Sequence, residues 1–199
     1  MTIKVCGITQ IADAAAAAAL GVHAIGFVFW PSSPRAMTPS RARAIIERLP
    51  PFVTPVGVFV DPDAALVAEC RDVGIQVAQV VGNVPPLPAG MGLLRAVTLA
   101  ADGIGITPAI PDDVPVLLDT HDPVQRGGTG RTLDWRAVSR ISRQRPVILA
   151  GGLRPDNVGE AIRLASPTGV DVSSGVERAP GMKDHERLAA FVAAVRAVA

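Results

Sequence analysis

A short apolar run near the start of the chain, Ile3-Lys4-Val5-Cys6, is followed at once by the turn Gly7-Ile8-Thr9. A second run, Val114-Pro115-Val116-Leu117-Leu118-Asp119, also ends in a residue that can exchange a proton. Both patterns are typical of a buried strand whose last residue faces a loop. Because parallel strands of a barrel end at one common mouth, we expect Cys6 and Asp119 to meet there.

Similar apolar runs alternate with helical patterns along the rest of the chain. Strands are expected at residues 3–6, 24–29, 56–60, 76–81, 93–99, 114–119, 147–150 and 170–172. Helices are expected at 10–20, 40–49 and 62–73, from 134, from 155, and at 183–198, with Thr9 capping the first of them. Eight such repeats without a break predict a single α/β domain, residues 1–199, folded as a (β/α)8 TIM barrel. An open doubly wound sheet is the alternative on pattern alone.

Two segments in the middle of the chain lack a helical pattern. Residues 83–92 contain Pro85, Pro86 and Pro88, and residues 100–113 contain further glycines and prolines. Proline removes an amide donor and clashes with the preceding turn of a helix. We therefore expect the helices after strands 4 and 5 to be lost or reduced. Loss of these helices would expose apolar faces of the strands, which the 83–92 loop or a partner subunit would then have to cover.

Composition narrows the class of protein. Apolar residues make up 49% of the 199 residues and the formal net charge is +1, so we expect no nucleic-acid partner. No apolar run approaches the ~20 residues of a membrane span, and no secretory signal is visible, so we expect a cytoplasmic protein with no membrane partner. Cys6 and Cys70 are expected to be free thiols, with Cys70 in the core.

Small residues follow the last two predicted strands. Gly151-Gly152 come after the seventh strand, and Ser173-Ser174-Gly175 come after the eighth. Loops of this kind expose backbone N–H groups, and two adjacent ones suit a phosphate dianion. Taken alone, Gly151-Gly152 is equally consistent with a simple tight turn.

Three side chains are candidates for chemistry at the same end of the barrel. Arg35, on a loop held by Pro31 and Pro34, is placed to clamp a carboxylate, or else is a solvated surface residue. Asp119 is a candidate general acid, or else caps the loop 126–130. Cys6 is a candidate base in its thiolate form, or else a buried structural thiol. The sequence contains no metal-ligand spacing, P-loop or dinucleotide fingerprint, so we expect no metal.

Several of these segments together resemble the phosphoribosylanthranilate isomerase family of tryptophan biosynthesis, and the resemblance spans nearly the whole chain. The segments are Lys4-Val5-Cys6-Gly7-Ile8-Thr9, residues 24–35, residues 56–60, Leu117-Leu118-Asp119, Gly127-Gly128-Thr129-Gly130, Ala150-Gly151-Gly152-Leu153 and residues 169–177. One departure is Gln79-Val80-Val81-Gly82, where the family usually has Gln-Leu-His-Gly.

The resemblance implies an aldose–ketose isomerase that needs no cofactor and acts on a phosphorylated small molecule. It implies that Asp119 protonates the ribose ring oxygen and that Cys6 removes the proton from C2′. The implied substrate-binding residues are Arg35, Gly151, Gly152, Asp171, Ser173, Ser174 and Gly175. The protein is expected to be a monomer or a homodimer.

Two other interpretations remain open. One is a related sugar-phosphate isomerase of the histidine pathway, although those enzymes use two aspartates where this chain has Cys6 and Asp119. The other is a barrel that binds a phosphorylated ligand without catalysis, which only the shortened middle of the chain favours.

Overall fold

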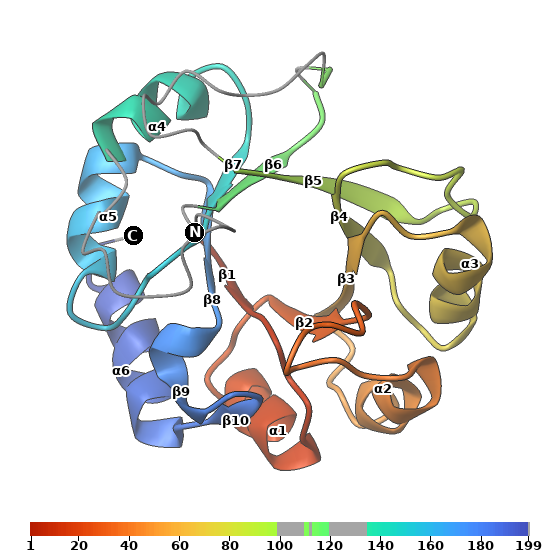
Figure 1. Cartoon of the computed structure of the whole chain (residues 1–199). Helices are drawn as coiled ribbons and strands as arrows, with labels where there is room; N and C mark the ends of the chain where they lie inside the picture. The colour runs from red at the N-terminus through yellow and green to blue at the C-terminus, as the bar shows by residue number, and fades with distance from the viewer. Residues whose placement is uncertain (99–109, 112, 120–134, 199) are drawn as a thin grey trace.

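Eight parallel strands close into a barrel in the computed structural model, which describes residues 1–98, 110–111, 113–119 and 135–198. Each strand pairs with the next, and β8 pairs with β1 so that Lys4 lies opposite Asp171. The strands are β1 Thr2–Val5, β2 Ala24–Val28, β3 Thr54–Val60, β4 Val77–Val81, β5 Gly92–Thr98, β6 Val116–Asp119, β7 Val147–Leu149 and β8 Gly169–Val172. The predicted (β/α)8 fold is confirmed, and the open sheet is excluded (Figure 1).

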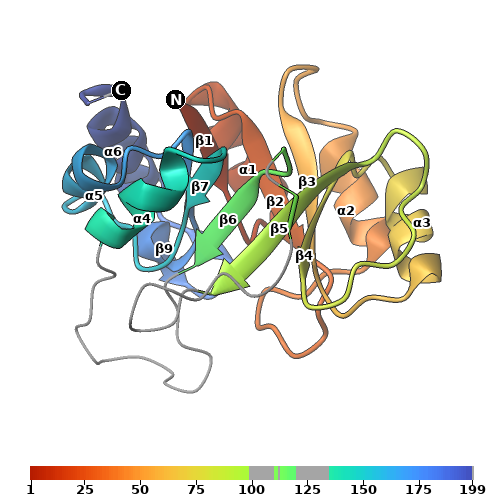
Figure 2. The same cartoon turned by 90° about the horizontal axis from the view of Figure 1, so that it is seen from above.

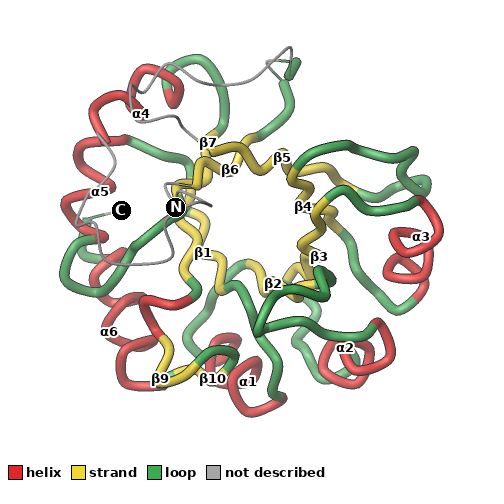
Figure 3. Tube along the Cα trace, in the orientation of Figure 1, coloured by secondary structure: helices red, strands yellow, loops and turns green. Residues whose placement is uncertain are grey.

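Helices surround the ring of strands (Figure 3). Figure 2 shows α4, α5 and α6 on one side of the strands and α2 and α3 on the other. Asp63 and Asp184 precede α3 and α6 and cap them, since each carboxylate accepts hydrogen bonds from backbone N–H groups of the first turn. The helices are α1 Ile11–Ala19, α2 Pro39–Ile46, α3 Ala64–Asp72, α4 Trp135–Ser142, α5 Val158–Ala165 and α6 His185–Arg196.

The predicted cap of α1 is wrong. Gln10, not Thr9, is the residue before the helix, and its side chain makes no capping bond. The Thr9 hydroxyl instead donates to the carbonyl of Gly181, 2.6 Å away. Thr9 therefore ties the loop after β1 to a segment 172 residues further along the chain.

The segment between β4 and β5 contains no helix, as predicted. All of residues 82–91 are described, and their prolines prevent a helical ladder. Leu87 and Met91 of this loop pack against the main hydrophobic cluster, so the loop supplies part of the cover that a helix would give. The corresponding prediction for the helix after β5 falls mostly on residues 99–109 and 112, which lie outside the described part of the chain.

A small hairpin precedes the last helix, where the sequence predicted helix from residue 183. A 3-10 turn, η1 Ser174–Val176, leads into β9 Glu177–Ala179, which pairs with β10 Met182–Lys183 in an antiparallel manner. Gly181 makes the turn with a φ of +76°, a conformation that other residues rarely adopt. The hairpin brings Lys183, together with Glu177, to the ends of β1 and β8, and α6 starts only at His185.

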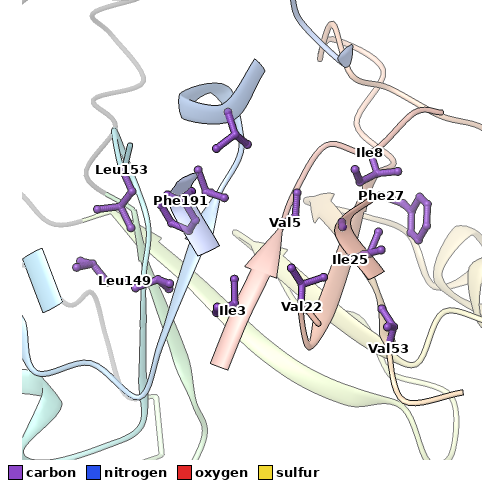
Figure 4. Close-up of a cluster of buried hydrophobic side chains, with 14 of the residues drawn as sticks. Ile3, Val5, Ile8, Val22, Ile25, Phe27, Val53, Leu149, Leu153 and Phe191 are labelled. Carbon is purple, nitrogen blue, oxygen red and sulfur yellow. The ribbon is translucent and has the colours of Figure 1, made fainter. Parts of the chain in front are cut away.

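The core has two layers because side chains alternate across each strand. The outer layer packs the barrel against the helices, and Figure 4 shows part of it, with Val5, Phe27 and Leu149 from the strands and Phe191 from α6. The second buried cluster is small and consists of Leu94, Ala96, Leu117 and Ala150. The same alternation turns Cys6 to the face of β1 opposite Val5, so Cys6 lines a cavity at the mouth.

The cover provided by the 83–92 loop can be tested by truncating Met91. Met91 is 9% exposed and packs in the core, so Met91→Ala should lower the free energy of unfolding by about 2–3 kcal/mol. Val84 in the same loop is 37% exposed, and Val84→Ala should change the free energy of unfolding by less than about 0.5 kcal/mol. Chemical denaturation measures both. Equal changes in the free energy of unfolding for the two substitutions would contradict a structural role for the loop.

Candidate active site

Two adjoining cavities lie at the carboxyl ends of the strands. The first, about 220 Å³, lies among the loops after β7 and β8, and the second, about 210 Å³, lies over the barrel interior. Residues common to both cavities are Asp119, Asp171 and Ser173. Cys6 lines the second cavity, and the first is lined by Arg35, Gly151, Gly152, Ser174 and Gly175. The structure thus brings together every site residue predicted from the sequence.

The two glycine-containing loops are shaped for close approach to a ligand. Gly151 and Gly152 have φ values of +81° and +63°, and no heavy atom lies within 4 Å of where a Cβ on Gly152 would stand. A Cβ on Gly175 would overlap the carbonyl of Leu153, so the two loops are in direct contact. Small residues at these positions keep both backbones open to the first cavity.

Asn157 supports the first of these loops. Its side chain donates to the carbonyl of Gly152 at 3.0 Å and accepts from the backbone N–H of Arg154 at 2.7 Å. These two bonds hold the loop after β7 in its turn and bring the chain into α5. Asn157 is a positioning residue that the sequence reasoning did not single out, although side-chain amides in tight loops often act in this way.

Cys6 is a buried thiol, 8% exposed, at the end of β1. Burial raises the pKa of Cys6 above the usual value for a thiol. The charge of Lys4 and, more weakly, that of Lys183 oppose this rise, while Asp171 adds to it. The sequence left the ionisation of Cys6 undetermined, and the structure shows which neighbouring charges control it. Cys6 and Cys70 are both free thiols, as predicted.

A buried ion pair lies beside Cys6. Lys4 Nζ contacts Asp171 Oδ1 at 2.9 Å, with the two side chains 3% and 8% exposed. Burial tends to lower the pKa of Lys4, but Asp171 and Cys6 raise it above its usual value. Lys4 is therefore an ammonium inside the barrel, which is stable only because it has an anionic partner.

Glu177 is the centre of a second buried network. Its carboxylate accepts from Lys183 Nζ at 2.8 Å and from Arg35 Nε at 2.9 Å. The same Lys183 ammonium donates to the backbone carbonyls of Cys6, at 2.6 Å, and Ser173, at 3.2 Å. Glu177 and Lys183 thus connect Arg35 to the ends of β1 and β8.

Arg35 is not a solvated surface residue. Its side chain is 20% exposed, and Nε and Nη2 bind Glu177 on one edge. The hydrogen bonds to Glu177 raise the pKa of Arg35, so its charge is permanent. The other edge of the guanidinium, Nη1 with the second N–H of Nη2, makes no bond to a described residue and is available for a two-pronged contact with a carboxylate.

Two further cavity residues lie on β4. Gln79 is 6% exposed, and its Oε1 has no hydrogen-bond partner within the described ranges. Val81 lines the same cavity at the position where the resemblance leads one to expect histidine. The alternative role for Asp119, a cap on the loop 126–130, concerns residues outside the described part of the chain.

Three buried charged residues that support the site were not predicted from the sequence: Lys4, Glu177 and Lys183. One signal was present for Lys4, because residues two apart on a strand share a face and Cys6 had been placed at the mouth. Neither Glu177 nor Lys183 carried such a signal, since the hairpin that positions them was not predicted.

Eight parallel strands with a thiol, a carboxylate and permanent cations at their carboxyl ends define a (β/α)8-barrel enzyme of the kind that transfers protons. A family model described as N-(5'-phosphoribosyl)anthranilate (PRA) isomerase matches residues 3–194. The chain belongs to this family.

Individual relatives agree with the family match. The chain is 48% identical to the N-(5'-phosphoribosyl)anthranilate isomerase of Acidithiobacillus ferrooxidans, covering 98% of this chain and 97% of that one. Two structures of the Thermotoga maritima enzyme align over 99% of both chains, with TM-scores of 0.85 and 0.78 at 34% and 30% identity, and the second describes monomers generated from the dimeric enzyme. A third family structure holds reduced 1-(o-carboxyphenylamino)-1-deoxyribulose 5-phosphate, with a TM-score of 0.81, 31% identity and 99% coverage of both chains.

The Glu177 network yields a prediction for stability. Burial would raise the pKa of Glu177, but its hydrogen bonds to Arg35 and Lys183 hold that pKa below the usual value. A carboxylate of this kind stabilises the fold above its unfolded-state pKa, and the contribution is lost as the pH falls through the lower folded-state pKa. Glu177→Gln should lower the free energy of unfolding near neutral pH by about 3 kcal/mol, because it leaves Lys183 buried without an anion.

Denaturant unfolding at a series of pH values measures this effect. The loss of unfolding free energy caused by Glu177→Gln should become smaller in acid, because the Glu177 carboxylate of the wild type is then protonated and uncharged. Glu186→Gln, at an exposed position in the first turn of α6, is the matched control and should cost less than about 1 kcal/mol. A deficit that stays constant down to low pH would contradict the role assigned to the charge of Glu177.

Proposed function

We propose that the mouth of this barrel catalyses the reaction for which its family is named. The reaction is the Amadori rearrangement of N-(5-phospho-β-D-ribosyl)anthranilate to 1-(2-carboxyphenylamino)-1-deoxy-D-ribulose 5-phosphate, a step of L-tryptophan biosynthesis. The observation that supports it most directly is that Cys6 and Asp119 line one cavity, next to a second cavity formed by two glycine-containing loops. This is the arrangement that an acid, a base and a phosphorylated sugar require.

The phosphate is assigned to the first cavity. Gly151, Gly152, Ser173, Ser174 and Gly175 would surround it, with backbone N–H groups as the main donors. Phosphate sites formed by the loops after strands 7 and 8 recur in this fold. Binding the phosphate there places the ribose over the second cavity, within reach of both proton-transfer residues.

Asp119 is assigned as the general acid. In this role it protonates the ribose ring oxygen, the bond from that oxygen to C1′ breaks, and C1′ becomes an iminium carbon conjugated with the anthranilate nitrogen. Asp119 lines both cavities, so its carboxyl lies at the junction where the sugar ring would stand. A carboxylic acid in this position supplies the proton without a metal or a cofactor.

Cys6 is assigned as the base. Its thiolate removes the proton from C2′, the electron pair moves to neutralise the iminium ion, and the resulting enolamine tautomerises to the ketone. Burial disfavours the thiolate, so the cations around Cys6 are needed for this step. Arg35 would hold the anthranilate carboxylate with the edge of its guanidinium that Glu177 leaves open.

A single domain acting on a phosphorylated small molecule, as a monomer or a homodimer in the cytoplasm, is consistent with the dimeric Thermotoga maritima relative. None of the helices in the described part of the chain has the length and apolar character that crossing a membrane needs.

Replacing either proton-transfer residue tests this function. Cys6→Ser and Asp119→Asn should each lower kcat by at least about 100-fold, because each removes the general acid or base of a proposed proton transfer. Turnover of the anthranilate substrate by purified protein measures the effect, and complementation of a tryptophan auxotroph that lacks this isomerase tests it in cells. Cys70→Ala is the control, since Cys70 is a buried core thiol away from both cavities and its loss should leave kcat unchanged.

Normal turnover in either variant would refute the assigned mechanism. Failure of the well-expressed wild-type protein to complement would refute the activity and favour a barrel that only binds a phosphorylated ligand.

The proposed contact between Arg35 and the anthranilate carboxylate can be tested separately from proton transfer. Arg35→Ala should raise KM by about 10-fold or more and change kcat less, because it removes a contact present in both the bound substrate and the transition state. The KM for the anthranilate substrate and the inhibition constant for inorganic phosphate, measured on the same variant, distinguish the two anion sites. An unaltered KM, or an equal loss of affinity for inorganic phosphate, would contradict the assignment.

A further inference from the structure

Both lysines of the chain lie beside Cys6. The sequence has 19 basic residues, of which Lys4 and Lys183 are the two lysines. Their side chains are 3% and 2% exposed, so neither contributes to the surface charge of the protein. Placing two ammonium groups inside a barrel is costly, and groups of this kind are usually paired or functional.

The bonds of Lys183 and Lys4 indicate different tasks. An ammonium has three N–H donors. Lys183 uses all three, on the carbonyls of Cys6 and Ser173 and on Glu177. Within the described residues, the ion pair with Asp171 engages one donor of Lys4, so two donors remain for a nearby acceptor.

The thiol of Cys6 lies close to these donors. A Cβ built on Gly26 of β2 would lie 2.9 Å from Cys6 Sγ and 3.1 Å from Lys4 Nζ, so the two atoms are at most 6.0 Å apart. The absence of a side chain on Gly26 gives the ammonium and the thiol a shared space. An opposite charge at 4–6 Å is close enough to stabilise a thiolate strongly inside a protein.

The other charged groups around Cys6 act differently. Asp171 on β8 disfavours a thiolate, and Lys183 on β10 favours it but is directed at the backbone. Arg35, after β2, is bound to Glu177, and Asp119 on β6 lines the same cavity as Cys6. Lys4 is thus the cation that shares the space over Gly26 with the sulfur and, among the described residues, still has donors to offer it.

We propose that Lys4 is a positioning residue for the thiolate of Cys6: its ammonium, held in place by Asp171, donates to the sulfur in its anionic form. This inference rests on the proposed role of Cys6 as the base. In the reaction, Lys4 keeps its three protons throughout, and the proton that leaves C2′ moves onto the sulfur. Lys4 thereby offsets the cost of forming an anion inside the barrel without taking part in proton transfer.

Titration of Cys6 in the free enzyme tests the inference without substrate. The chain contains no tyrosine, so its thiols are the side chains whose ionisation raises the ultraviolet absorbance in alkaline solution. The difference between the wild type and Cys6→Ser isolates Cys6 from Cys70. Lys4→Met should move the midpoint for Cys6 upward by about one pH unit or more, which is about a tenfold loss of thiolate below the midpoint.

Asp171→Asn is the matched variant for Lys4→Met, and it should shift the Cys6 midpoint in the opposite direction. It removes the anion that disfavours the thiolate, and its amide oxygen can still accept a hydrogen bond from Lys4. The thiolate then becomes the anionic partner of the ammonium, so the midpoint should move downward. Opposite shifts in the two variants support the inference, because a general loosening of the site would move both in the same direction. Shifts of the same sign, or no shift in Lys4→Met, would overturn it.

A third variant covers the case in which Lys4→Met fails to fold because Asp171 is left unpaired. The double substitution Lys4→Met with Asp171→Asn removes both charges together, and its midpoint should lie above that of the wild type. A midpoint equal to or below the wild-type value would overturn the inference. Because the titration does not depend on turnover, an active Cys6→Ser enzyme would refute the role of Cys6 as the base and leave the titration result unaffected.

Discussion

The pairing of β8 with β1 is the constraint on which the rest of this structure depends. It closes the barrel, and at the closure Lys4 meets Asp171 across 167 residues of sequence. Removing two charged groups from water is costly, so the pair persists only because closure brings them to 2.9 Å in a fixed geometry. The same closure places the loop after β8 next to the end of β1, and this is where Cys6 and Ser173 come to line one cavity.

The short hairpin β9–β10 then binds this arrangement from the outside. Lys183 reaches the carbonyls at the ends of β1 and β8, and Glu177 holds both Lys183 and Arg35. A few buried, charge-assisted hydrogen bonds therefore hold strand ends whose loops carry little regular structure. Such bonds are strong when every member has its partner, so this network fixes the ends of β1 and β8 relative to Arg35 in the loop after β2.

Much of the fold and of the site was predictable from local patterns. Eight apolar runs identified the strands because parallel strands are buried on both faces, and the prolines at residues 83–92 correctly excluded a helix there. Cys6, Asp119 and the glycine-containing loops were placed at the mouth because each follows a strand. The hairpin was missed because its two- and three-residue strands have no periodicity to detect, and Thr9 was assigned to a cap because its hydroxyl partner, Gly181, is distant in sequence.

Local sequence patterns predicted the order of strands and helices and the chemistry at each strand end, and short motifs carried the resemblance to an isomerase family. The order of the elements depends on the period of hydrophobic residues and on turn residues, which act over a few positions. Only the tertiary structure decided which charges surround Cys6, because Lys4 and Lys183 acquire their roles from partners on β8 and on the hairpin. The ionisation of a buried thiol depends on desolvation and on charges within a few ångströms, and these exist only once the barrel has closed.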